Sequence, residues 1–187
     1  MVEGSQVDWA GHDNDIVAAM SEMEDYDRAF QAAIEFAKQD ENTLVVATAD
    51  HSTGGFSIGA DGIYNWFAEP ILAAQRTPDF MATEITDGAG VEETLERYID
   101  LELTEEEIAA VKKAADEGEY LDIDNAIERI FDKRSHTGWT TGGHTGEDVP
   151  VYAYGPASQK FAGNLNNTDH AGIIFDLMGV DVTIDDK

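Results

Sequence analysis

Six carboxylate and imidazole side chains are the groups in this sequence best suited to chemistry, because together they offer the ligands that divalent metal ions prefer. They fall into three separated clusters: Glu3, Asp8 and His12; Asp50 and His51; and His144. Mixed oxygen and imidazole ligands suit zinc-type ions, and a further carboxylate suits a harder ion such as magnesium. The clusters therefore predict a centre that holds divalent cations.

The first cluster has the spacing of a helix. Asp8 and His12 are four residues apart, so on a helical turn they share one face and could hold one cation. A solvated helix face has the same spacing, so the pair alone leaves both interpretations open.

The second cluster follows an apolar, β-branched run at 43–49, which predicts a strand buried on both faces. Asp50 and His51 can serve one site only if the chain turns off the strand, and the small residues at 52–55 favour such a turn. The pair would then lie at the carboxyl end of a buried strand, where open α/β sheets bind ligands.

His144 lies in the glycine-rich segment 140–146, before a strand-like segment at 149–154. A histidine on such a loop is a good ligand candidate. A loop histidine that bonds a backbone carbonyl is the alternative.

The elements around these residues predict an α/β fold with a mostly parallel sheet flanked by helices. Helical periodicity over 22–39 leads into the strand at 43–49, and a second helix at 168–178 ends at Gly179. The segment 56–64 is predicted to form a hairpin-like structure. We assign 1–58 and 136–187 to one domain.

Residues 59–135 are predicted to be an acidic, largely helical insertion in that domain. Thr104 and Glu107 form a capping-box pattern, and a further helix is expected to begin at Asp122 or Asp124. Met81 and Leu95 are predicted core residues. The charge runs are interpreted as solvated helix faces.

Composition excludes several classes of partner. The chain has 39 acidic and 11 basic residues, for a formal net charge of -28, which opposes binding to nucleic acid or to anionic membrane. It has no cysteine, so neither disulfides nor thiolate ligands are available. No apolar stretch approaches the roughly 20 residues of a membrane helix, and no signal peptide pattern is visible.

The amino-acid sequence around the predicted ligands resembles that of alkaline phosphatases. It is carried by Met-Val-Glu-Gly-Ser-Gln-Val-Asp-Trp-Ala-Gly-His at 1–12, Thr-Ala-Asp-His at 48–51 and Gly-Gly-His-Thr-Gly at 142–146. The resemblance is to the C-terminal portion of a bacterial member, and the acidic composition predicts a halophilic one.

This resemblance implies two zinc ions and one magnesium ion. It places Asp8, His12 and His144 on the first zinc, Asp50 and His51 on the second, and Glu3 on magnesium. Trp9 stands where some relatives carry a basic residue near the phosphate, and His136 is a weaker candidate for the same vicinity. His170 is expected to be a surface residue.

The implied activity is hydrolysis of phosphate monoesters through a phosphoserine intermediate. The family's nucleophilic serine and phosphate-clamping arginine are expected upstream, so no catalytic nucleophile is assigned here and the missing N-terminal part is an expected partner. The resemblance also implies a periplasmic or secreted protein and allows a homodimer. Two alternatives remain: an inactive divalent-metal-binding fragment, and a related two-zinc phosphodiesterase or phosphomutase.

The acidic composition predicts that salt stabilises the fold. The chain has 39 carboxylates that repel one another. The screening length of this repulsion is roughly 3 Å at 1 M salt and about 30 Å at 0.01 M, so the repulsion is stronger at low salt. We expect the melting temperature to rise steadily as sodium chloride is added between these limits. A melting temperature that stays flat across the series would contradict the halophilic interpretation.

Overall fold

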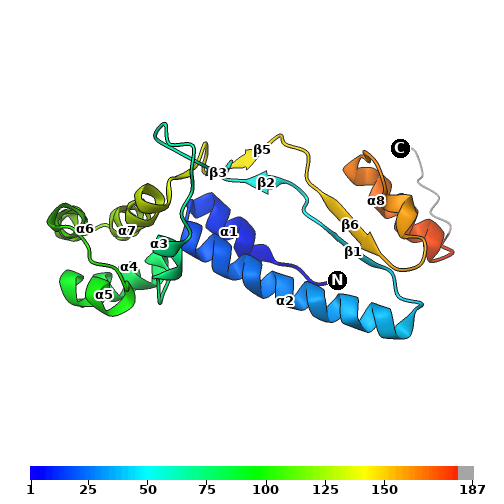
Figure 1. The fold of residues 1–187 in the computed structure, drawn as a ribbon, viewed down its shortest axis with the longest axis horizontal. Helices are drawn as coiled ribbons and strands as arrows, with labels where there is room; N and C mark the ends of the chain where they lie inside the picture. The colour runs from blue at the N-terminus through cyan, green and yellow to red at the C-terminus, as the bar shows by residue number, and fades with distance from the viewer. Residues whose placement is uncertain (181–187) are drawn as a thin grey trace. The chain divides into compact units, whose positions relative to one another are not determined.

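The computed structural model describes residues 1–180 and divides the chain into two compact units. Unit 1 comprises Met1–Tyr26 and Thr53–Thr145, and unit 2 comprises Asp27–Ser52 and the chain from Gly146 onward. The long helix α2 (Ile16–Asp40), drawn in Figure 1, begins in unit 1 and ends in unit 2. The assignment of 59–135 as an insertion stays a prediction.

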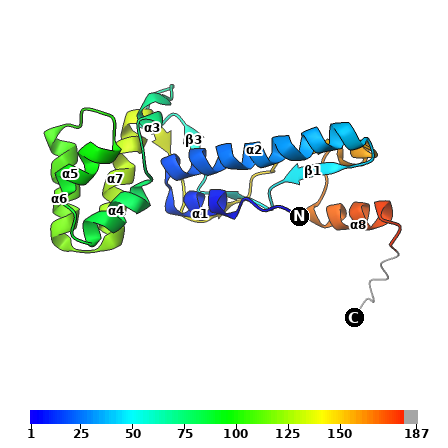
Figure 2. The same ribbon diagram turned by 90° about the horizontal axis from the view of Figure 1, so that it is seen from below.

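Unit 1 is mainly helical. Its helices besides the start of α2 are α1 (Ser5–Asp13), α3 (Glu69–Leu72), α4 (Pro78–Thr86), α5 (Val91–Tyr98), α6 (Glu105–Glu117) and α7 (Tyr120–Ser135). Figure 2 shows α4 to α7 gathered together, with α7 packed against α4 and α6. The predicted helix start at Asp122 or Asp124 is two or more residues late, since α7 begins at Tyr120.

The core of unit 1 lies among these helices. Ile123, Ile127 and Phe131 recur at helical spacing on α7 and are almost fully buried. Met81 and Leu95 are also buried, which confirms their prediction as core residues. Helix α7 ends where His136 adopts a left-handed conformation, with φ of 59°.

Unit 2 contains a small antiparallel ladder. Strand β1 (Val45–Thr48) pairs with β6 (Val151–Tyr154), with Val45 opposite Tyr154. A 3-10 turn (Ser158–Phe161) and α8 (Asn167–Leu177) follow, and Gly179 has positive φ after α8, as predicted.

The strands differ from the prediction in two respects. Within residues 1–180 the sheets β1–β6, β2–β5 and β3–β4 have two strands each, so the predicted mostly parallel sheet is not confirmed. The remaining strands are β2 (Ser52–Thr53), β3 (Ser57–Ile58), β4 (Thr137–Gly138) and β5 (His144–Thr145). The prediction that 43–49 is buried on both faces is wrong, because Val45, Val46 and Ala47 are half-buried and Thr48 is exposed.

The hairpin predicted for 56–64 is also wrong. Strand β3 pairs antiparallel with β4, and Ser57 lies opposite Gly138. Gly59 and Gly62 have positive φ, so the chain bends within this segment without pairing with itself. The partner strand lies far away in sequence, where local turn chemistry gives no information.

No helix among the described residues is long and apolar enough to cross a membrane.

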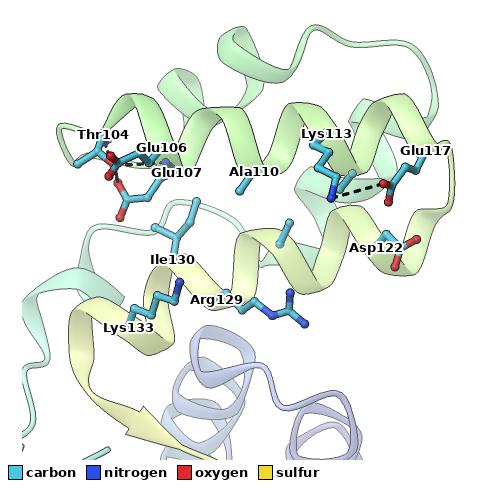
Figure 3. A pocket seen from close by; sticks show the side chains of 12 residues that line it. Thr104, Glu106, Glu107, Ala110, Lys113, Glu117, Asp122, Arg129, Ile130 and Lys133 are labelled. Carbon is cyan, nitrogen blue, oxygen red and sulfur yellow. Dashed lines mark hydrogen bonds and ion pairs between the residues drawn. The ribbon is translucent and has the colours of Figure 1, made fainter. Parts of the chain in front are cut away.

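The start of α6 is capped, and an ion pair between Glu107 and Arg134 joins it to α7. The predicted capping box is confirmed: Glu107 N–H donates to Thr104 Oγ1 at 3.2 Å, and Thr104 N–H donates to Glu107 Oε2 at 2.7 Å. These two residues lie at one end of the groove between α6 and α7 (Figure 3). Arg134 of α7 donates to both carboxylate oxygens of Glu107, at 2.7 and 2.6 Å. This bidentate pair lowers the pKa of Glu107 to about 2.

Glu107→Gln is therefore expected to destabilise the chain by about 1–3 kcal/mol at neutral pH. Because the folded pKa lies below the ordinary value of 4.5, this stabilisation is present above pH 4.5 and is lost as the pH falls towards 2. Urea unfolding at several pH values measures both effects. The exposed neighbour Glu106 supplies the matched control, Glu106→Gln, and equal losses in both variants would contradict the prediction.

Candidate metal centre

Three of the six predicted ligands meet in unit 1. Asp8 and His12 lie one turn apart on α1, with Asp8 Oδ2 at 3.5 Å from His12 Nε2, so their predicted common helix face is confirmed. His144 on β5 brings its Nε2 to 3.2 Å from that of His12, across 132 residues of sequence. One ligand atom from each of the three residues lies within 4.8 Å of the other two.

The end of α1 is fixed to the loop that carries His144. Asn14 adopts a left-handed conformation that ends α1, with φ of 62°. Its side-chain amide donates to the carbonyl oxygens of Gly11 and Thr141, each at 2.9 Å. One asparagine therefore stops the helix and holds the 140–146 loop beside it.

Two further contacts orient the ligands. His12 Nδ1 lies 2.8 Å from the carbonyl oxygen of Gly142, so this nitrogen donates and Nε2 keeps its lone pair. Thr53 Oγ1 donates to Asp8 Oδ1 at 2.6 Å, while Oδ2 is the oxygen on the His12 side. Sequence reasoning missed Thr53, Asn14 and Gly142, because hydrogen bonds across so many residues have no periodic signal.

Glycine allows the backbone segments to approach closely. Gly54 has φ of +82°, and a Cβ atom there would lie 2.6 Å from the carbonyl oxygen of Gly11 in α1. Gly54 N–H donates to the carbonyl oxygen of Gly143 at 2.8 Å. Gly54 is thus placed between the ligand helix and the ligand loop, where no larger residue fits.

The donor set fits zinc. Zinc–nitrogen bonds of about 2.05 Å at a tetrahedral angle separate two ligand nitrogens by roughly 3.3 Å, close to the 3.2 Å between the two Nε2 atoms. Both histidines are exposed and Asp8 is half-buried. Three protein ligands on an accessible site are typical of catalytic zinc, where the fourth position takes water or substrate.

Asp50 and His51 belong to unit 2, just beyond the end of β1. Their side chains lie together, with His51 Nε2 at 3.3 Å from Asp50 Oδ2, and the Asp50 side chain is 88% exposed. The predicted turn after them is present, since Gly54 and Gly55 have positive φ. Their role as ligands stays a prediction.

The other candidates are not members of the three-residue cluster. Glu3 is exposed before α1 and belongs to neither group of potential metal ligands found among residues 1–180. Trp9 is 65% exposed on α1. His136 packs its ring at 5.6 Å from that of Phe67, and His170 on α8 is half-buried beside Phe161. The roles predicted for Glu3, Trp9 and His136 stay predictions.

The groove between α6 and α7 has a different character (Figure 3). Its walls carry mixed charges, among them Lys113, Glu117 and Arg129, and none of the predicted ligands. It is therefore a less suitable place for the metal chemistry than the cluster on α1 and β5.

Fold and cluster together favour a metal-binding α/β protein, and comparison with known proteins identifies its family. The alkaline phosphatase family model matches residues 1–180. The chain is 70% identical to alkaline phosphatase 3 of Bacillus subtilis over 190 residues, which cover 100% of the chain and 41% of that relative. The chain therefore belongs to the alkaline phosphatase family and spans about two fifths of the length of this relative.

Solved structures agree with this assignment. The chain is similar to the cold-active alkaline phosphatase of a psychrophilic Shewanella, with a TM-score of 0.90 and 38% identity, over 95% of this chain and 44% of that one. It is also similar to a variant of the alkaline phosphatase of the Antarctic bacterium TAB5 with Mg bound in a site called M3. That match has a TM-score of 0.55 and 27% identity over 96% of this chain and 35% of that one. The alkaline-phosphatase-like α/β fold is thus supported.

Proposed function

We propose that this chain is part of a metal-dependent alkaline phosphatase that hydrolyses small phosphate monoesters. The observation that carries the proposal is the cluster of Asp8, His12 and His144, whose ligand atoms lie together in a chain of this family. Family membership favours a phosphomonoesterase over the related phosphodiesterases and phosphomutases. By the same resemblance we propose a periplasmic or secreted location.

The proposed metals are two zinc ions and one magnesium ion. Asp8, His12 and His144 would hold one zinc, Asp50 and His51 the other, and Glu3 the magnesium. Bound zinc supplies an activated oxygen nucleophile at neutral pH and stabilises negative charge on the leaving oxygen.

The side chains of this chain do the positioning. The carbonyl oxygen of Gly142 fixes the ring of His12, and Thr53 holds the carboxylate of Asp8, so both ligands are oriented before a metal arrives. The exposure of His12 and His144 leaves a side on which a phosphate ester can approach. The net charge of -28 repels phosphate at long range, so attraction must come from the bound cations.

We further propose that the nucleophilic serine and the phosphate-clamping arginine come from the rest of the enzyme. The relatives are more than twice as long as this chain, which leaves room for both groups. Ser52 follows His51 directly and is the serine of this chain that most needs to be tested as a nucleophile.

An assay with p-nitrophenyl phosphate tests this proposal. We expect no turnover from the 187 residues alone with zinc and magnesium, and turnover once they are joined to an upstream segment that carries Asp-Ser-Ala. In the joined form, His144→Ala should abolish turnover, and His170→Ala on α8 is the matched control. Turnover by the isolated chain that disappears in Ser52→Ala would overturn the assignment of the nucleophile.

A further inference from the structure

A row of carboxylates runs along one side of α7. Asp124, Glu128 and Asp132 occur at every fourth position, so they lie on the same helix face. The sequence predicts solvated faces for the charge runs of this region, and that prediction is wrong for two of the three. Asp124 is only 1% exposed and Glu128 only 5% exposed, among the apolar side chains of the core.

Both buried carboxylates have an oxygen without a partner. Among residues 1–180, Asp124 Oδ1 and Glu128 Oε1 are buried and accept no hydrogen bond. Buried polar atoms are nearly always paired, and leaving one unpaired costs free energy. These two oxygens therefore lack either a donor or a cation.

A third carboxylate from another helix completes a group around the same point. Asp13, the last residue of α1, places a carboxylate oxygen such that the three ligand atoms of Asp13, Asp124 and Glu128 all lie within 4.8 Å of one another. Asp13 is exposed, whereas the other two are buried. The group thus has a buried floor and an opening to solvent through which an ion can enter.

The electrostatic environment of this group is strongly negative. Burial first, and neighbouring carboxylates second, raise the pKa of Asp124 to about 8 and that of Glu128 to about 9. The charged groups that raise these pKa values are all acidic: Asp13, Asp15 and Asp79 act on Asp124, and Asp124, Asp13, Asp15 and Asp132 act on Glu128. A bound cation would balance the charge of these carboxylates and give both unpaired oxygens a partner.

We propose that Asp13, Asp124 and Glu128 bind one calcium ion in unit 1, at a site separate from the Asp8, His12 and His144 cluster. The ligand set contains only oxygen, which favours a hard cation over zinc. Calcium accepts several protein carboxylates in flexible geometry, whereas magnesium usually takes one or two and keeps its waters. The ion would join α1 to α7.

Calcium titration of the full 187-residue chain tests the site. The chain is treated with chelator, dialysed free of it, and titrated with calcium chloride in a calorimeter at about 0.5 M sodium chloride, which keeps screening nearly constant. We expect one tight site per chain and a higher melting temperature with calcium. Asp124→Asn and Glu128→Gln should each weaken calcium binding at least about tenfold, because each removes one ligand charge.

Two controls separate this site from other places where calcium could bind. Asp122→Asn changes an exposed carboxylate of the same helix and should leave calcium affinity unchanged. His144→Ala alters the zinc cluster and should also leave it unchanged. Circular dichroism in the presence of chelator establishes whether each variant is folded. If Asp124→Asn is unfolded, the calcium affinity of Glu128→Gln tests the site. The absence of calcium binding, wild-type calcium affinity in folded Asp124→Asn or Glu128→Gln, or loss of binding in His144→Ala would each overturn the proposal.

Discussion

Zinc is expected to raise the melting temperature of this chain, and His144→Ala is expected to abolish that rise. An ion that binds only the folded chain stabilises it by roughly 2.7 kcal/mol when its free concentration is about 100 times its dissociation constant. For a chain of this size that corresponds to roughly 5–10 °C. His144 is the ligand that the 140–146 loop contributes, so without it Asp8 and His12 offer zinc two ligands in place of three.

Thermal denaturation with and without zinc measures this effect. His170→Ala is the matched control, because it removes an imidazole from α8 in unit 2, and the full zinc response should persist. A zinc response of equal size in wild-type chain and His144→Ala would refute the proposed ligand set. No response in either would refute zinc binding by the isolated chain.

Gly54→Ala is expected to destabilise the chain by about 2–4 kcal/mol. Two costs add at this position. The left-handed conformation, with φ of +82°, disfavours any residue with a Cβ atom, and that atom would lie 2.6 Å from the Gly11 carbonyl oxygen and 2.7 Å from the Trp139 ring. Because the Gly11 oxygen is backbone, α1 itself must move, and zinc affinity should fall together with stability.

Gly62→Ala separates the two costs. Gly62 also has positive φ, +76°, but no atom lies within 4 Å of the position where its Cβ would be. We expect this variant to lose only the conformational part, about 1 kcal/mol, with zinc affinity unchanged. Urea unfolding of both variants makes the comparison, and equal losses would contradict a steric role for Gly54.

Local signals in the sequence predict part of the candidate metal centre and part of the fold. The spacing of Asp8 and His12 predicted their common helix face, and the pattern of Thr104 and Glu107 predicted the capping box, because both features depend on residues within one helical turn. The approach of His144 followed only from resemblance to the family. No local pattern specifies a contact over 132 residues.

Two predictions that the structure contradicts have different causes. The partner of β3 lies beyond the whole helical region, so the turn residues near Gly59 suggested a hairpin that does not form. Asp124 and Glu128 were interpreted as solvated because acidic residues are rarely buried. A signal was available, since both fall next to the apolar residues Ile123 and Ile127 on the same turns of α7.

The metal cluster also has a topological consequence. His12 and His144 are 132 positions apart, so an ion held by both closes a loop of most of the chain, much as a disulfide would. With such an ion bound, a chain without any cysteine would have a reversible cross-link that reducing agents leave intact and chelators open. We therefore expect metal removal to accelerate global unfolding as well as to disturb the ligands.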